Sequence, residues 1–141
     1  MIKKIKILDT INTSILVGLI WTIQIVHYPS FNFIATENYN NFQVFHMNAI
    51  TTLVGPLMGL EMILFLLAVN YKLYPKKISI FFILLLISTI WLTTAFVSVP
   101  LHNKLVAGKD LEAIATLVST NWIRTLAWTL KLILMSIWQI E

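Results

Sequence analysis

Four long apolar stretches alternate with short polar segments along this 141-residue chain. Each stretch holds about 20 residues, and a helix rises roughly 1.5 Å per residue, so each is long enough to cross a bilayer core of about 30 Å. The pattern predicts an all-α fold, an integral membrane four-helix bundle that forms a single domain over residues 1–141. The expected spans cover about 8–28, 49–70, 78–99 and 121–140.

Two prolines mark the expected ends of the first and third spans. Pro29 and Pro100 follow the apolar stretches, and proline cannot continue a helix without losing a hydrogen bond. The lysine-rich start and the first apolar stretch together resemble a signal peptide. Asn12, Thr13 and Ser14 interrupt the start of that stretch, however, and no small-x-small cleavage site follows it. We therefore expect an uncleaved first span.

The connection between the third and fourth spans contains a helix signal of its own. Gly108-Lys109-Asp110 is expected to break one segment and to cap the next. The apolar residues that follow fall at helical spacing: Leu111, Ile114, Ala115 and Val118. This spacing predicts a short helix in the membrane interface, between spans three and four.

Most lysines are expected on the side of the membrane that holds both termini. That side carries Lys3, Lys4, Lys6, Lys72, Lys76 and Lys77. The opposite side carries Lys104 and Lys109. Because short loops rich in Lys and Arg stay in the cytoplasm, both termini are predicted to be cytoplasmic.

The composition excludes several classes of protein. Hydrophobic residues make up 58% of the chain and charged residues 11%, which is too apolar for a soluble domain of this size. Lys and Arg outnumber Asp and Glu by 10 to 6, but no basic cluster with interleaved aromatics suggests nucleic acid. The absence of cysteine excludes disulfides and thiolate metal sites. The expected partners are membrane lipids and either a second copy of the chain or another membrane protein.

Glu61 is the only charged residue in the second span. A carboxylate at that depth costs several kcal/mol unless it is neutralised or paired, so the helix must turn it toward protein or water. Helical arithmetic brings Lys131 to a similar depth, with Arg124 as a shallower candidate partner. Two interpretations stay open, a structural ion pair that fixes the helix register and a site that handles protons or substrate.

All three histidines fall at the outer ends of the spans. His27 ends the first span, His46 precedes the second and His102 follows the third. Gln24 lies one turn below His27 on a similar face. Imidazoles are common metal ligands, but the chain lacks the His-x-x-x-His and Glu-x-x-His spacings. Ordinary interfacial histidines are the favoured interpretation, and no metal site is assigned.

Arg124 opens the fourth span beside Asn121 and Trp122, with Trp128 one turn further along. As an interface residue, its side chain would reach the phosphate headgroups. As a site residue, its planar guanidinium would bind a carboxylate or quinone-like oxygen between walls formed by Trp122 and Trp128. The sequence supports these two interpretations about equally.

Two local motifs carry a family resemblance. Val99-Pro100-Leu101-His102-Asn103-Lys104-Leu105 follows the third span, and Asn121-Trp122-Ile123-Arg124 opens the fourth. They resemble small four-helix bacterial membrane proteins of unknown function. More distantly they resemble the anthrone-oxygenase-like family, with its Pro-x-Asn-x-x-Leu-like motif and later Asn-x-x-Arg, although the leucine here falls at 105 rather than 106. The resemblance implies a four-helix bundle in a bacterial plasma membrane that oxygenates a polycyclic aromatic without an obvious cofactor.

Together these residues predict a pocket that opens toward the outer face and binds a small apolar or aromatic molecule, with oxidation as a further step. The expected catalytic residues are His27, Glu61, His102 and Arg124. The expected ligand contacts are Gln24, His46, Asn103, Asn121, Trp122 and Trp128. His27 or His102 would accept a proton, and Arg124 with Asn121 would stabilise oxyanion charge. The sequence identifies no cofactor.

A non-catalytic class competes with this prediction. The chain would then be an accessory or assembly subunit of a membrane complex, and its polar residues would only hold the helices together. Such a subunit predicts a closed interior, whereas a ligand site predicts a cavity. A transporter is disfavoured, because four spans without an internal repeat would need to oligomerise to enclose a pathway.

Overall fold

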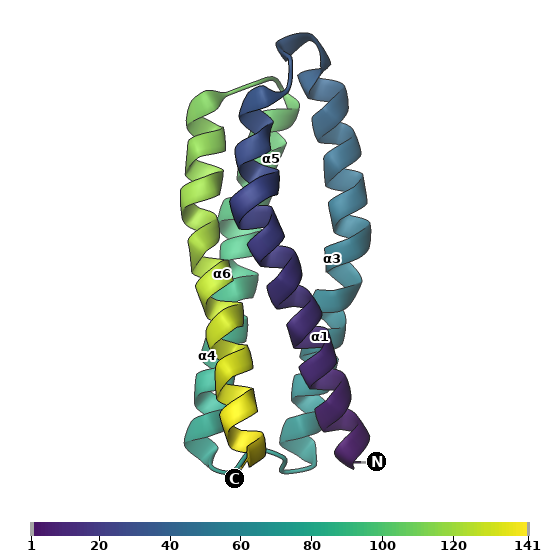
Figure 1. Ribbon diagram of the computed structural model, residues 1–141, viewed down its shortest axis with the longest axis vertical. Coiled ribbons are helices and arrows are strands. Elements are labelled where there is room, and N and C mark those ends of the chain that lie inside the picture. Colours follow the sequence, from purple (N-terminus) through teal and green to yellow (C-terminus); the bar gives the residue numbers. More distant parts are fainter. Residues whose placement is uncertain (1, 141) are drawn as a thin grey trace.

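The computed structural model describes the backbone of residues 2–140 and the side chains of residues 2–138. Four long helical segments lie side by side along one axis, and no strand occurs among the described residues (Figure 1). The first segment joins α1 (Ile2–Thr22), the π-helical turn η1 (Ile23–His27) and α2 (Tyr28–Ser30). Two 3-10 turns, η2 (Phe31–Phe33) and η3 (Thr36–Asn38), lead into the second segment, α3 (Tyr39–Asn70). The third segment joins α4 (Lys77–Thr93), the π-helical turn η4 (Thr94–Ser98) and α5 (Val99–Val106), and the fourth is α6 (Leu111–Ile140).

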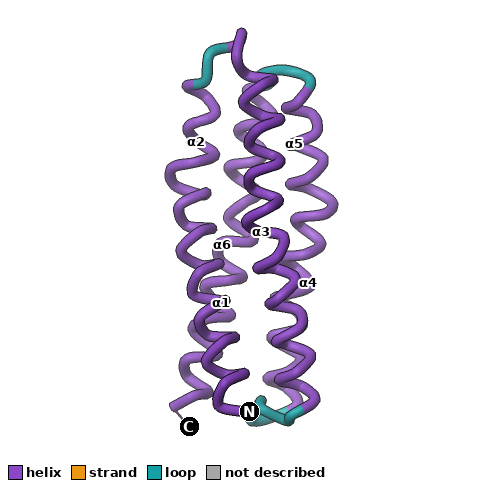
Figure 2. The backbone as a smooth tube through the Cα atoms, turned by 90° about the vertical axis from the view of Figure 1, so that its right-hand side faces the viewer, coloured by secondary structure: helices purple, strands orange, loops and turns teal. Residues whose placement is uncertain are grey.

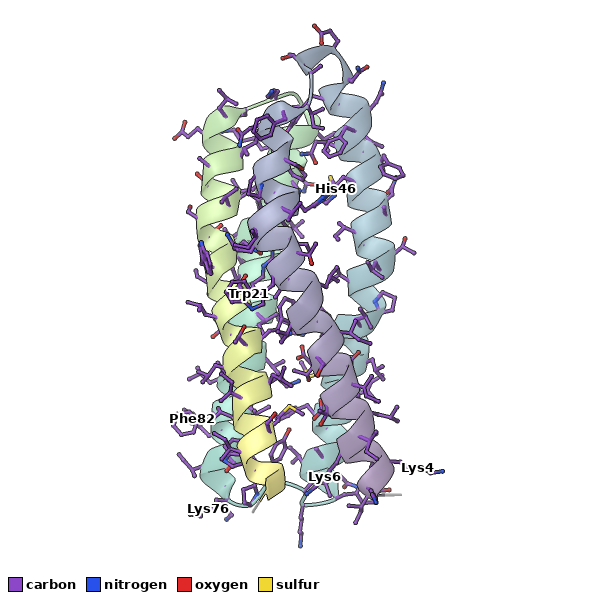
Figure 3. The ribbon with its side chains drawn as sticks, in the orientation of Figure 1. Lys4, Lys6, Trp21, His46, Lys76 and Phe82 are labelled. Atoms are coloured by element: carbon purple, nitrogen blue, oxygen red, sulfur yellow. The ribbon has the colours of Figure 1, made fainter. Side chains whose placement is uncertain are left out.

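Neighbouring segments run in opposite directions. α1 contacts both α3 and α6, α6 also contacts α4 and α5, and α5 contacts α3. Both termini lie at one end with the loop between α3 and α4, as the sequence predicts (Figure 1). Figure 2 shows the loops confined to the two ends of the molecule. The side chains of Lys4, Lys6 and Lys76 lie at the end with the termini (Figure 3).

The polarity of the molecule is the reverse of that of a soluble protein. Large apolar side chains cover the outside, and Phe96, for example, is 74% exposed. Among the described residues, the buried Asp, Glu, Lys and Arg side chains are instead these four: Asp9, Glu61, Arg124 and Lys131. Among the described residues, three helical segments are long and apolar enough to cross a membrane: Ile2–Phe33, Thr36–Asn70 and Lys77–Val106. These segments contain the first three predicted spans and suggest a membrane protein.

The fourth predicted span lies inside α6, which is not one of those three segments. The part of α6 that precedes Asn121 is predicted to form a separate interfacial helix. In the structure it continues without a break into the rest of α6, so it is not a separate helix. The physical reason is that Ile114 and Leu117 are fully buried in the main hydrophobic core, which fixes this part of the helix against its neighbours.

The two prolines do not end their helices, contrary to the prediction. Pro29 lies in α2 and Pro100 in α5, and a π-helical turn precedes each of them. The residue before each proline donates its N–H to the carbonyl five residues back. This wider turn relieves the clash between the proline ring and the preceding turn of the helix. Proline has no N–H, and the wider turn needs no N–H donor at that position. The third segment therefore extends past Pro100 and carries His102 into the interior.

The loop before α6 follows the predicted break and cap. Gly108 has a φ of 154°, which a residue without a Cβ adopts at little cost. The Asp110 carboxylate accepts the backbone N–H of Ala113 at 2.9 Å and pairs with Lys104 at 2.7 Å. Asp110 thereby satisfies one of the free N–H groups in the first turn of α6.

Candidate functional site

Arg124 is the centre of a buried polar cluster in the half of the molecule away from the termini. Its side chain is 6% exposed. Nη2 donates to the Tyr28 hydroxyl at 3.1 Å and to Asn121 Oδ1, and Nη1 donates to the Thr94 hydroxyl at 3.4 Å. These partners are neutral, and no carboxylate of the described residues forms an ion pair with Arg124. Three helical segments thus hold the guanidinium without a counter-ion.

The three histidines extend this cluster toward α3. The Tyr28 hydroxyl bonds to His102 Nε2 at 3.1 Å, and His27 Nε2 bonds to His46 Nδ1 at 2.9 Å. The centroids of the His46 and His102 rings are 5.0 Å apart. Figure 3 shows His46 pointing from α3 into the space toward α1. The histidines therefore converge at one end of the molecule, as the sequence predicts.

Several polar atoms of this cluster have unused hydrogen-bonding capacity. Arg124 donates to the Tyr28 oxygen, so the hydroxyl hydrogen is free to be donated to His102 Nε2, and Nδ1 then carries the ring N–H. Within the described part of the chain, His102 Nδ1, His46 Nε2 and Arg124 Nε are buried without a partner. Because buried polar atoms are nearly always hydrogen-bonded, these three are candidates for contact with a bound molecule.

Gln24 supports the arginine from the side of η1. Its amide donates to the Val118 carbonyl at 3.1 Å, and its oxygen accepts from Asn121 at 2.8 Å. Thr125 donates to the same oxygen at 3.4 Å. Asn121 therefore lies between Gln24 and Arg124, and its orientation is fixed from both sides.

A cavity of about 200 Å³ adjoins the cluster. Arg124, Tyr28 and His102 form its polar part together with Thr94 and Ser98. The remaining wall is mostly apolar and includes Leu16, Ile20, Ile23, Met47, Val54 and Met58. An apolar cavity of about 150 Å³ already holds benzene, so this space suits an aromatic molecule of one or two rings. Its lining is that of a typical small-molecule site, apolar with a few convergent polar groups.

The cavity reaches the surface between two helical segments. Thr51 and Gly55 of α3 and Val99 of α5 line the cavity and are also exposed. All three lie part of the way along their segments rather than in the loops. The opening therefore faces sideways, whereas the sequence predicts an opening toward the outer face.

A second buried cluster lies on the other side of Trp128. The Lys131 ammonium is 2.7 Å from Glu61 Oε1, 2.9 Å from the Thr13 hydroxyl and 3.5 Å from Asp9 Oδ1. Lys131 and Glu61 are fully buried. The predicted pairing of Glu61 with Lys131 is confirmed, and Arg124, the other candidate, does not pair with it. Two carboxylates therefore share one ammonium, an arrangement that sequence reasoning did not find.

A small cavity of about 40 Å³ connects this second cluster to the end with the termini. Asp9, Lys6 and Tyr74 line it, together with apolar residues. The Tyr74 hydroxyl is buried without a hydrogen-bond partner among the described residues. Burial raises the pKa of Tyr74, and the charges of Asp9 and Glu61 add to this effect.

The remaining predicted site residues separate into two groups. Gln24, Asn121 and the histidines lie in or beside the arginine cluster, and Trp128 lines the main cavity. Asn103 is exposed. Trp122 is 38% exposed and packs edge-on against Trp21, with centroids 5.6 Å apart. These last two side chains are not part of the cavity wall.

Asp9, Thr13 and Tyr28 are site residues that sequence reasoning missed. Asp9, Asn12 and Thr13 are all buried and share one face of α1, at the spacing of one helical turn. This one-sided polar stripe at the start of the first predicted span is the signal that could have identified Asp9 and Thr13. Tyr28 has no comparable signal, because a tyrosine at the end of a span is common at the lipid headgroups.

The chain has no match among known proteins in three comparisons. No family model, no curated protein and no solved structure matches it. Among the described residues, no group of three or more His, Cys, Asp or Glu side chains has the geometry to hold a metal ion. The two clusters and the two cavities are therefore the features of the molecule that bear on its function.

Proposed function

We propose that the chain is a small integral membrane protein that binds a largely apolar, aromatic molecule in the main cavity. The polar end of that molecule would face Arg124, Tyr28 and His102. The observation that carries this proposal is the combination of an apolar wall with a buried arginine whose partners, in the part of the chain that the structure describes, are all neutral. Such a guanidinium is a strong donor toward a carboxylate, phenolate or carbonyl oxygen.

A four-span arrangement with cytoplasmic termini is part of this proposal. α6 turns Arg124 and Lys131 inward, while its opposite face exposes Leu126, Leu130 and Ile133. This distribution supports a span over about 121–140, because charged groups in a membrane face the interior of a bundle and apolar groups face lipid. The lysines at the end with the termini support a cytoplasmic location of that end, in the plasma membrane of a bacterium.

The sideways opening supports entry of the ligand from the membrane. The exposed lining residues lie on the lengthwise surfaces of α3 and α5, at the level of the spans. An apolar molecule dissolved in the bilayer would reach the cavity there without crossing the polar loops.

If the ligand carries an acidic hydroxyl, Tyr28 would take its proton while passing its own proton to Nε2 of His102, so the final base is His102. Its ring lines the cavity, whereas His27 is bonded to His46 and is not part of the cavity wall. Arg124, oriented by Asn121, would stabilise the resulting oxyanion.

The competing class, an accessory subunit without a ligand, would need a closed interior. A cavity of about 200 Å³ with a buried polar end argues against it, because unfilled space and unpartnered polar atoms both cost stability. A single ligand-binding function explains both features.

The test is a binding titration with 1-naphthoic acid, a two-ring aromatic acid, in lipid nanodiscs. Trp128 lines the cavity, so its fluorescence reports occupancy. We expect saturable quenching in the wild type and at least tenfold weaker binding in Arg124→Gln. Absence of saturable binding, or equal binding by Arg124→Gln, would overturn the proposal.

A blocking variant keeps the test independent of the arginine. A Cβ added at Gly55 meets no atom within 4 Å, and Gly55 lines the cavity opening. Gly55→Leu should therefore fold and block binding. A Cβ at Gly59 also meets nothing within 4 Å, and Gly59 is not part of the wall, so Gly59→Leu is the matched control that should bind normally.

A further inference from the structure

The four buried charged side chains are two cations and two anions, but the two signs are unevenly distributed between the clusters. Arg124 and Lys131 are cations, and Asp9 and Glu61 are anions. Both carboxylates lie at Lys131, and within the described residues Arg124 has only neutral partners. With all four ionised and the histidines neutral, the arginine cluster carries one positive charge and the lysine cluster one negative charge. The two clusters lie on opposite sides of Trp128.

Binding of an anion at Arg124 would change this balance. The arginine cluster would become neutral, and the lysine cluster would keep one negative charge with no compensation in the interior. An uncompensated charge in a low-dielectric interior is strongly unfavourable, and uptake of a proton is the usual way to remove it. One proton at the lysine cluster would make both clusters neutral at the same time.

We propose that the protein binds its aromatic ligand as an anion together with one proton, and that Asp9 takes up this proton. The inference rests on the proposed function, because it concerns the ligand of the main cavity. It specifies that the ligand is an anion and that its binding is coupled to protonation of the second cluster. Ligand anion, proton and protein combine into a complex whose interior has no net charge, with neutral Asp9 beside the Lys131–Glu61 ion pair.

The geometry favours Asp9 over Glu61 as the proton acceptor. Glu61 lies 2.7 Å from the ammonium and accepts two hydrogen bonds from Trp128, all of which stabilise its charged form. Asp9 lies 3.5 Å from the same ammonium, and its contact with the Thr13 hydroxyl is also 3.5 Å. The carboxylate with the weaker contacts is the one that gains least from its charge.

The position of the charges favours Asp9 over the histidines. A proton on His102 would leave the arginine cluster positive and the lysine cluster negative, so two separated charges would remain buried. A proton on Asp9 leaves none. In a low-dielectric interior, opposite charges attract one another even over long distances, so keeping them apart costs energy.

Asp9 also has a route to water at the end with the termini. It lines the small cavity with Lys6 and Tyr74. The ionisable groups that face Asp9 are Lys6 from α1, Lys131 from α6, Tyr74 from the loop between α3 and α4, and Glu61 of α3 across the shared ammonium. The ligand would thus enter from the membrane, and the proton would enter from the end that carries most lysines.

The experiment measures proton uptake during binding of naphthalene-2-sulfonate, whose sulfonate stays anionic throughout the working pH range. The wild-type protein is titrated in weakly buffered solution with a pH indicator. We expect one proton taken up per bound ligand, and an affinity that falls tenfold per pH unit over the range in which Asp9 is ionised in the free protein. Because the ligand cannot accept the proton, any uptake belongs to the protein.

Asp9→Asn is the decisive variant. It removes the charge without moving the Lys131–Glu61 pair, so it should bind the sulfonate with no proton uptake and with an affinity independent of pH. Infrared difference spectra of the wild type provide a second readout, since a protonated carboxyl gives a C=O band that appears on binding and that protonated imidazole lacks. This second measurement does not depend on the folding of any variant.

The outcomes separate this inference from the proposed function. Saturable binding without proton uptake, uptake retained in Asp9→Asn, or uptake without the carboxyl band would each overturn the proton coupling and leave the binding site intact. Absence of saturable binding of both naphthoate and the sulfonate would instead overturn the proposed function itself.

Discussion

The indole N–H of Trp128 donates to both carboxylate oxygens of Glu61, at 3.1 and 3.3 Å. The same ring lines the main cavity, while Glu61 does not. Trp128 is 1% exposed, so it separates the cavity from the ion cluster as well as supporting it. The space that a ligand would occupy and the buried charges that would respond to it are therefore joined through one side chain.

Trp128→Phe removes this hydrogen bond and enlarges the cavity. A hydrogen bond to a charged group contributes about 1.5–3 kcal/mol, and the lost ring volume adds to the cost, so we expect a destabilisation of about 2–4 kcal/mol. Thermal unfolding in detergent measures it. Trp122→Phe is the matched control, because Trp122 is 38% exposed, and it should change the unfolding temperature much less.

Lys131→Met leaves two buried carboxylates without their cation. Removal of one member of a buried ion cluster typically costs roughly 3–5 kcal/mol, since the remaining charge is uncompensated. We expect a large loss of thermal stability and of folded protein after extraction. The triple variant Asp9→Asn, Glu61→Gln, Lys131→Met should recover most of it, because the polar shape is kept and no charge remains. A triple variant as unstable as Lys131→Met would show that packing of the lysine stem, not charge, is responsible.

The first three long helices and the central ion pair could be predicted because each depends on a local signal. Apolar stretches of sufficient length encode the first three helices. A lone Glu61 in such a stretch predicts a cation at equal depth, and Lys131 is that cation. The convergence of the three histidines followed from topology in the same way.

The rest depends on tertiary packing that the chain does not encode locally. The usual rule predicts that Pro29 and Pro100 end their helices, but a π-helical turn before each proline lets the helix continue. Asn103 and Trp122 belong to the motifs that suggest a site, yet their positions on the helices turn them outward. The sequence does not place Asp9 in a site, because its burial depends on the packing of α1 against α3 and α6.

Tyr28→Phe removes the hydroxyl that links Arg124 to His102. Both partners would lose a hydrogen bond while buried, which costs about 1–3 kcal/mol. We expect lower thermal stability and weaker binding of naphthoate, because the guanidinium is held less firmly. Tyr74→Phe is the matched control: its hydroxyl is buried without a partner in the described part of the chain, so its removal should leave stability unchanged or slightly higher.

The cap of α6 makes a prediction about pH. Hydrogen bonds from the Lys104 ammonium and from the Ala113 N–H hold the pKa of Asp110 below its ordinary value of 3.8. Because the folded-state pKa is lowered, the cap contributes stability above pH 3.8 and loses it as the pH falls through the folded-state value. The first turn of α6 should therefore be unchanged from neutral pH down to about pH 4.

Carbon-13 NMR of the Asp110 carboxyl measures this titration directly. The midpoint in the wild type should lie below 3.8. Lys104→Gln should raise it toward the ordinary value without reaching it, since the Ala113 N–H still donates to the carboxylate at 2.9 Å. An identical midpoint in both proteins would mean that the backbone cap alone stabilises the charge and that the Lys104 pair contributes nothing, as is common for exposed ion pairs.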